Sequence, residues 1–132
     1  MLRELFIRNV AVIRQARIPW RTGLNAITGE TGAGKTVLIS SIDAVLGERT
    51  SKEIIRAGEA KAQITAVFDG INPRARAALE ELGCTDEDGE VLITRELTSS
   101  GKRPCRITEM PATASMLRQI ATLLITVHGQ RD

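Results

Sequence analysis

Eight consecutive residues near the start of the chain combine two glycines, a lysine and a threonine at the spacing of a phosphate-binding loop. They fit the pattern G-x-x-x-x-G-K-S/T and are Gly29, Glu30, Thr31, Gly32, Ala33, Gly34, Lys35 and Thr36. Gly29 and Gly34 allow backbone angles and a close approach that a Cβ would forbid, so the amides between them can point at phosphate oxygens. We expect Lys35 to reach the β- and γ-phosphates and the Thr36 hydroxyl to bind Mg²⁺.

The residues on either side of this loop predict the strand and the helix that such a loop must connect. Residues 24–28 are half apolar and follow the turn signal Thr22-Gly23. Residues 37–46 carry apolar side chains at helical spacing, and Gly47 follows as a helix stop. A helix that begins at the loop adds its positive N-terminal end to the anion site. We therefore expect residues 29–36 to bind the phosphates of a nucleotide.

The composition of the whole chain is that of an ordinary globular domain. Its 132 residues are 42% hydrophobic and 26% charged, which is enough for one domain with its own core. A net charge of +2 does not by itself indicate a polyanionic partner. One Trp, two Phe and no Tyr do not make a stacking platform for single-stranded nucleic acid. No stretch has the length of a membrane span and no secretory signal opens the chain, so we expect no membrane partner.

The cysteines and the histidine exclude the common metal sites. Cys84 and Cys105 match no metal-binding spacing, and we expect them to be reduced thiols of a cytoplasmic protein. His128 is the only histidine, which excludes a site built from several histidines.

Hydrophobic periodicity predicts the remaining elements. Strands are expected at residues 2–7, 10–18, 62–69, 91–97, 103–107 and 124–127, and helices at residues 72–82 and 113–123. Asn9 is expected in the turn between the first two strands, and Pro19 at the end of the second strand or at a sheet edge. Gly83 is expected to close the first of these helices, and residues 86–89 to form an acidic turn.

Four segments of the chain together resemble the RecN family of bacterial DNA repair proteins, which are relatives of the SMC proteins with an ABC-type ATPase head. In chain order they read L-x-x-L-x-I-x-N-x-A-V-I, G-L-N-A-I-T-G-E-T-G-A-G-K-T, I-I-R-A-G and L-L-I-T-V-H-G-Q. They span nearly the whole chain. One departure is the sequence at residues 107–111, where the family tends to show an I-N-G turn.

The resemblance implies roles for several residues. It implies that residues 29–36 bind ATP and Mg²⁺. It identifies Gln130 with the glutamine of the ABC-type Q-loop, which contacts Mg²⁺ and responds to the γ-phosphate. It places Arg56 in a loop that lies near nucleotide or DNA in SMC-like heads. By the residues alone, an ordinary surface position for Arg56 remains open.

The resemblance also implies partners. The family's head needs a signature motif and a later aspartate–glutamate pair, and neither is found in residues 1–132. We therefore expect the chain to be the N-terminal part of an ATPase head, from the phosphate loop to the Q-loop, which binds ATP but does not hydrolyse it alone. The expected partners are the C-terminal half of the same head, a second head in an ATP-dependent dimer, and DNA through the full-length protein. The expected location is the cytoplasm, at the nucleoid.

The predicted fold class is α/β, a P-loop NTPase of the ABC/SMC head type. An antiparallel β-rich subdomain would lie against a partly parallel sheet that carries the phosphate loop. Two other functions remain open. One is a self-contained small P-loop kinase or GTPase, although the sequence offers neither a catalytic aspartate after a hydrophobic strand nor N-K-x-D. The other is a non-catalytic module that docks the rest of the head.

Overall fold

The fold is described by a computed structural model that covers residues 2–11, 13–19, 32–48, 54–69, 71, 73–84 and 89–125. Within residues 32–38, only Val37 is described beyond its backbone. The predicted strand at residues 24–28, the first half of the phosphate loop, most of the acidic turn and Gln130 lie outside the described residues.

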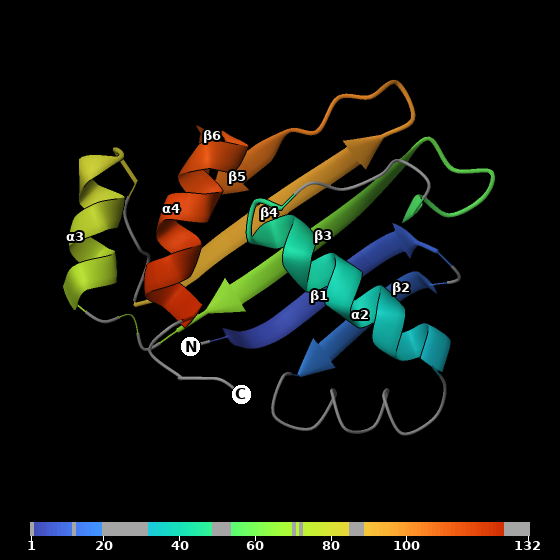
Figure 1. Ribbon diagram of the computed structural model, residues 1–132, viewed down its shortest axis with the longest axis horizontal. Helices are drawn as coiled ribbons and strands as arrows, with labels where there is room; N and C mark the ends of the chain where they lie inside the picture. The colour runs from blue at the N-terminus through green and yellow to red at the C-terminus, as the bar shows by residue number, and fades with distance from the viewer. Residues whose placement is uncertain are drawn as a thin grey trace.

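One six-stranded sheet forms the centre of the structure (Figure 1). Its strands follow the order β2-β1-β3-β4-β5-β6, and every neighbouring pair is antiparallel. The strands are β1 (Leu2–Val10), β2 (Ile13–Pro19), β3 (Lys61–Phe68), β4 (Val91–Thr98), β5 (Cys105–Ile107) and β6 (Met110–Ala112). This is the antiparallel part of the predicted fold.

Three helices accompany the sheet: α2 (Gly32–Val45), α3 (Pro73–Glu81) and α4 (Ala114–Ile125). Helix α2 contacts β1, β3 and β4, and α3 contacts α4. Figure 1 shows α2 lying across the strands, with α4 near one end of α2 and α3 beyond α4. In the part of the chain that the structure describes, no helix is long and apolar enough to cross a membrane.

The core lies between the sheet and the helices and follows from the period of two along each strand. One row of side chains crosses five strands: Ile18, Leu5, Ala66, Ile93 and Ile107 are successive cross-strand neighbours. All five are buried. On α4, Leu117, Ile120 and Leu124 are also buried and belong to the same core cluster. The buried side chains of the strands, which recur with a period of two, thus share one core with the apolar stripe of α4.

Most of the predicted elements are confirmed, with shifts of one to three residues. The second strand ends at Pro19 and is an outer strand of the sheet among the described residues, a position where a residue without an N–H is tolerated. Asn9 and Ala11 have positive φ values of 57° and 53° at the β1–β2 turn, although β1 itself continues to Val10. Gly83 closes α3 with a φ of 81°.

One prediction is wrong. The apolar run that begins at Leu124 was expected to form a strand, but α4 continues through Ile125. Leu124 follows Leu117 and Ile120 at helical spacing, so the helix buries it on the same stripe. The return strand expected at residues 103–107 is confirmed as β5, although it begins two residues later, at Cys105. The segment after Ile107 forms a two-residue turn and then β6, a strand that the sequence did not predict.

Candidate nucleotide-binding site

The second half of the phosphate loop forms the beginning of α2. The helix starts at Gly32, so residues 32–36 of the G-x-x-x-x-G-K-T pattern make its first turn. The first N–H groups of a helix have no partner within the helix, and together with the helix dipole they form a site for an anion. A helix therefore follows the motif, as a phosphate-binding loop requires. The structure leaves the roles of Lys35 and Thr36 as predictions, since it describes only their backbone.

The far half of α2 shows how the helix is held against the sheet. Val37, Ala44 and Val45 are buried, and Ser41 is buried between them. Serine and alanine are small enough to let the helix backbone approach the strands. The opposite side of the helix is open, since Ile39 is 47% exposed. One face of α2 is therefore fixed on β1, β3 and β4, while its outer face is free of the described residues.

The end of α2 is held by residues that the sequence analysis did not single out. Gly47 N–H donates to Ala44 O (3.2 Å) and Glu48 N–H donates to Asp43 O (3.0 Å), the two bonds of a Schellman cap. Arg95 of β4 donates from Nη1 to the Ala44 oxygen at 2.7 Å, and Arg118 of α4 donates from Nη1 to the Gly47 oxygen at 3.0 Å. The glycine stop is visible in the sequence, whereas the contacts of the two arginines join residues that are far apart in the chain.

Arg56 lies beside the β1–β2 turn. Its N–H donates to Asn9 O (2.8 Å), and the preceding Ile55 forms an isolated bridge with Val10. The guanidinium Nε of Arg56 is buried and has no hydrogen-bond partner among the described residues. Figure 1 shows the β1–β2 turn and the first turn of α2 toward the same end of the molecule. A role for Arg56 toward nucleotide or DNA remains a prediction.

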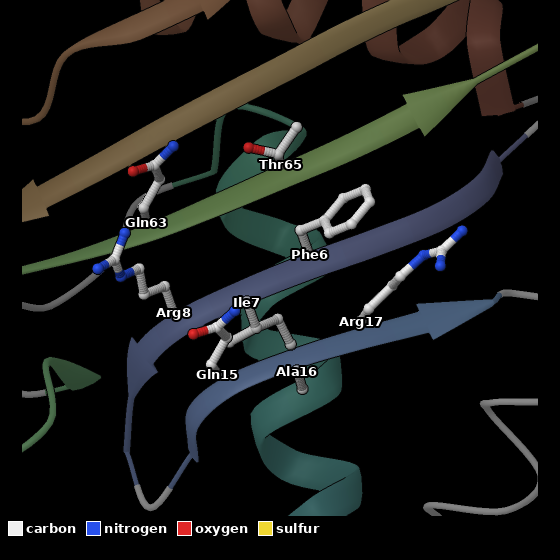
Figure 2. A pocket seen from close by; sticks show the side chains of 8 residues that line it. All are labelled: Phe6, Ile7, Arg8, Gln15, Ala16, Arg17, Gln63 and Thr65. Carbon is white, nitrogen blue, oxygen red and sulfur yellow. The ribbon is translucent and has the colours of Figure 1, made fainter.

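The face of the sheet that points away from α2 carries a separate hollow of about 480 Å³ (Figure 2). It is lined by Phe6, Ile7, Arg8, Gln15, Ala16, Arg17, Gln63 and Thr65. Arg17 stacks over the Phe6 ring at 5.8 Å and pairs with Glu4 at 2.6 Å. In Figure 2, α2 runs behind the strands, whereas Phe6, Arg8 and Arg17 point to the front. This hollow is therefore not part of the phosphate site on α2.

The two cysteines lie in the hydrophobic core. Cys84 and Cys105 are free and buried, as expected for reduced thiols. Burial raises the pKa of both thiols, and the positive charge of Arg95 partly opposes that rise at Cys105. Within the described ranges, no group of three His, Cys, Asp or Glu residues could hold a metal ion. The Mg²⁺ ligands predicted at Thr36 and Gln130 are side chains outside that description.

Comparison with known proteins agrees with this geometry. The chain is 40% identical over 134 residues to the DNA repair protein RecN of Halalkalibacterium halodurans and 38% identical to that of Bacillus subtilis. The alignments cover 100% of this chain but only 24% and 23% of those proteins, so the chain spans about a quarter of their length. The fold is that of the SMC ATPase head. A solved structure from work on ATP-driven dimerisation and DNA-stimulated activation of SMC ATPases superposes with a TM-score of 0.73 at 21% identity. It covers 94% of this chain and 79% of the other. Residues 4–116 match the AAA domain family, and the chain belongs to that family.

Proposed function

We propose that residues 1–132 are the N-terminal part of an ATPase head of the RecN type and that they bind ATP together with Mg²⁺. The observation that carries this proposal is the start of α2 inside the glycine–lysine–threonine loop. That arrangement presents free backbone N–H groups at the loop, which fits a triphosphate. AAA and SMC proteins use nucleotide and Mg²⁺ in general, which agrees with the family match.

Each predicted site residue has a defined task in this proposal. Residues 29–36 surround the β- and γ-phosphates, with Lys35 as the point charge. Thr36 and Gln130 supply oxygen ligands to Mg²⁺, which prefers such ligands in proteins. Arg56 stands at the end of the sheet nearest the first turn of α2 and faces nucleotide or DNA. When bound, Mg²⁺ neutralises phosphate charge, and the chain's own residues position the triphosphate.

The proposal extends to the activity of the whole protein. The relatives that match across this chain are DNA repair proteins about four times its length, which supports a role in DNA repair. Recombinational repair of double-strand breaks is the role that we propose within it. The partners would be the remaining half of the same head, a second head joined on ATP, and DNA bound by the full-length protein. ATP-driven dimerisation is described for the solved SMC neighbour and supports the second of these partners. The protein would act in the cytoplasm, at the nucleoid.

The experiment that tests the proposal measures phosphate release from the purified chain, with and without the rest of the head added as a separate polypeptide. The chain alone should release no more phosphate than its Lys35→Ala variant, because residues 1–132 supply no general base for the attacking water. Adding the other half should restore turnover. Gln130→Ala should then reduce hydrolysis more than it reduces ATP binding, since its contacts matter most as charge develops.

Steady phosphate release by the chain alone that disappears in Lys35→Ala would contradict the proposal. That result would favour a self-contained small P-loop enzyme. Binding of the other half without any effect of ATP would favour a non-catalytic docking module instead.

A further inference from the structure

Arg95 is the one charged side chain that is buried among the residues whose side chains are described. It is 4% exposed, and its cross-strand neighbours on β3 and β5 are Ile64 and Cys105, both buried. It therefore lies on the core face of β4, where the period of two calls for an apolar residue. A buried guanidinium is costly unless its N–H groups are paired. The Nη1 of Arg95 has carbonyl acceptors, whereas its buried Nε has no hydrogen-bond partner among the described residues.

The acceptors of Arg95 are two carbonyl groups at the C-terminal end of α2, one in its last turn and one just after its cap. Its Nη1 donates to Ala44 O at 2.7 Å and lies 3.3 Å from Glu48 O. These carbonyls belong to the C-terminal end of the helix, where the helix dipole is negative and a positive charge is stabilising. Arg95 thus joins the centre of β4 to the end of α2 over 51 residues of chain.

Arg118 holds the same end of α2 from the side of α4. Its Nη1 donates to Gly47 O at 3.0 Å. The backbones are also in close contact there, because a Cβ added to Gly47 would lie 2.7 Å from Ala114 O and 2.8 Å from the Cγ of Arg118. A glycine with a φ of +90° is therefore required both by the turn and by the approach of α4.

The opposite end of α2 carries the phosphate loop. The helix has 14 residues and so spans about 21 Å at 1.5 Å per residue. A hydrogen-bonded helix moves as a stiff rod over that length, and a tilt at one end displaces the other. Neither arginine lies at the phosphate end of the rod. Any effect of these two arginines on nucleotide binding must therefore be transmitted along α2.

We infer that Arg95 and Arg118 are positioning residues for the phosphate loop, which lock the C-terminal end of α2 to β4 and to α4. The inference rests on the proposed nucleotide site. It makes two claims: loss of either guanidinium weakens ATP binding at a site the arginine does not touch, and it loosens the first turns of α2 as well as the last.

The test uses Arg118→Met, Arg95→Lys and Arg95→Met in the full-length gene product. Methionine keeps an apolar stem and removes the N–H donors, and lysine keeps the positive charge and N–H donors on a compact ammonium group. Arg106→Met is the matched control, because Arg106 is an exposed arginine on β5, opposite Thr94 and on the other face of the sheet from Arg95. Binding of a fluorescent ATP analogue with Mg²⁺ is measured well below the unfolding temperature. Hydrogen–deuterium exchange is followed in peptides that cover α2.

Arg118→Met should weaken binding about threefold to tenfold, because only part of the free energy of one hydrogen bond to a charged donor is transmitted along α2 to the phosphate site. Arg95→Lys should weaken it by less than Arg95→Met. In these variants the amides of the N-terminal half of α2 should exchange faster, and Arg106→Met should match the wild type in both measurements. A merely stabilising role would lower the unfolding temperature and leave the affinity and the exchange of the first turns unchanged. That outcome in the folded variants would overturn the inference.

Arg118→Met and Arg95→Lys decide the matter if Arg95→Met does not fold. The proposed function and this inference fail in different ways. A wild-type protein that binds no Mg-ATP overturns both, whereas a wild type that binds and variants that bind equally well overturn only the positioning role.

Discussion

Gly47 and Ala114 approach so closely that a Cβ on Gly47 would stand 2.7 Å from the Ala114 carbonyl oxygen. Gly47→Ala should therefore destabilise the protein through two effects, the strained positive φ and the collision with α4. Together these should cost about 2–4 kcal/mol. Gly58→Ala is the matched control, since Gly58 has a φ of +87° with nothing within 4 Å of the added Cβ.

Urea unfolding measures the free energy of unfolding of both variants and of the wild type. Gly58→Ala should show only the backbone cost, about 1 kcal/mol. Equal losses in the two variants would contradict the close packing of α2 against α4.

Ile93 occupies the middle of the buried row that crosses five strands, and it is fully buried. Ile93→Ala should cost about 2–5 kcal/mol, because the sheet and helices cannot collapse fully into the cavity. The neighbouring Leu92 lies on the other face of β4 and is 36% exposed. Leu92→Ala should cost distinctly less, so a larger loss for Leu92 than for Ile93 would show that the faces of β4 are assigned the wrong way round.

Asp43 lies in the last turn of α2, where the helix dipole disfavours a negative charge. Burial raises the pKa of its carboxyl, and the neighbouring Glu48 raises it further. The folded state then binds more protons than the unfolded state between the ordinary carboxyl pKa of 3.8 and the raised pKa of the folded state. Stability contributed by this group is present below that window and is lost as the pH rises through it.

Asp43→Asn should accordingly raise the unfolding temperature at pH 7 and flatten the pH dependence in that window. The gain from the dipole alone is about 0.3–1 kcal/mol. Thermal unfolding from pH 3 to pH 8 checks it, with Glu109→Gln on the exposed β5–β6 turn as the control. A variant that is less stable than the wild type at pH 7 would show that Asp43 has a stabilising partner.

Period-two patterns in the sequence were sufficient to predict four strands of the sheet, because alternate residues such as Ile64, Ala66 and Phe68 all face the core. β6 escaped prediction because three residues with a central proline carry no such period. Pro111 is tolerated there because β6 is an edge strand. The end of α4 was mistaken for a strand because a short apolar run has no period that separates the two structures.

The candidate site also has one part that the sequence predicts and one part that it does not. The phosphate loop is local in sequence and was recognised from residue types and spacing. The hydrogen bonds at the other end of α2 join residues that are separated by 51 and 71 positions in the sequence. Such contacts exist only after the sheet and α4 have formed. An arginine in the middle of an otherwise apolar strand pattern, as at Arg95, is the signal that could have pointed to it.

The most direct test of the nucleotide site is equilibrium binding of a labelled ATP analogue, with Mg²⁺, to Lys35→Ala and to Lys61→Ala. Lys61 is an exposed lysine at the first position of β3, so its replacement removes the same charge from a position outside the phosphate loop. Lys35→Ala should weaken binding at least about tenfold, equivalent to about 1.4 kcal/mol, because a charge facing the phosphates is lost. Lys61→Ala should bind as the wild type does. Unchanged affinity in a folded Lys35→Ala variant would contradict the assignment of residues 29–36 as the nucleotide site.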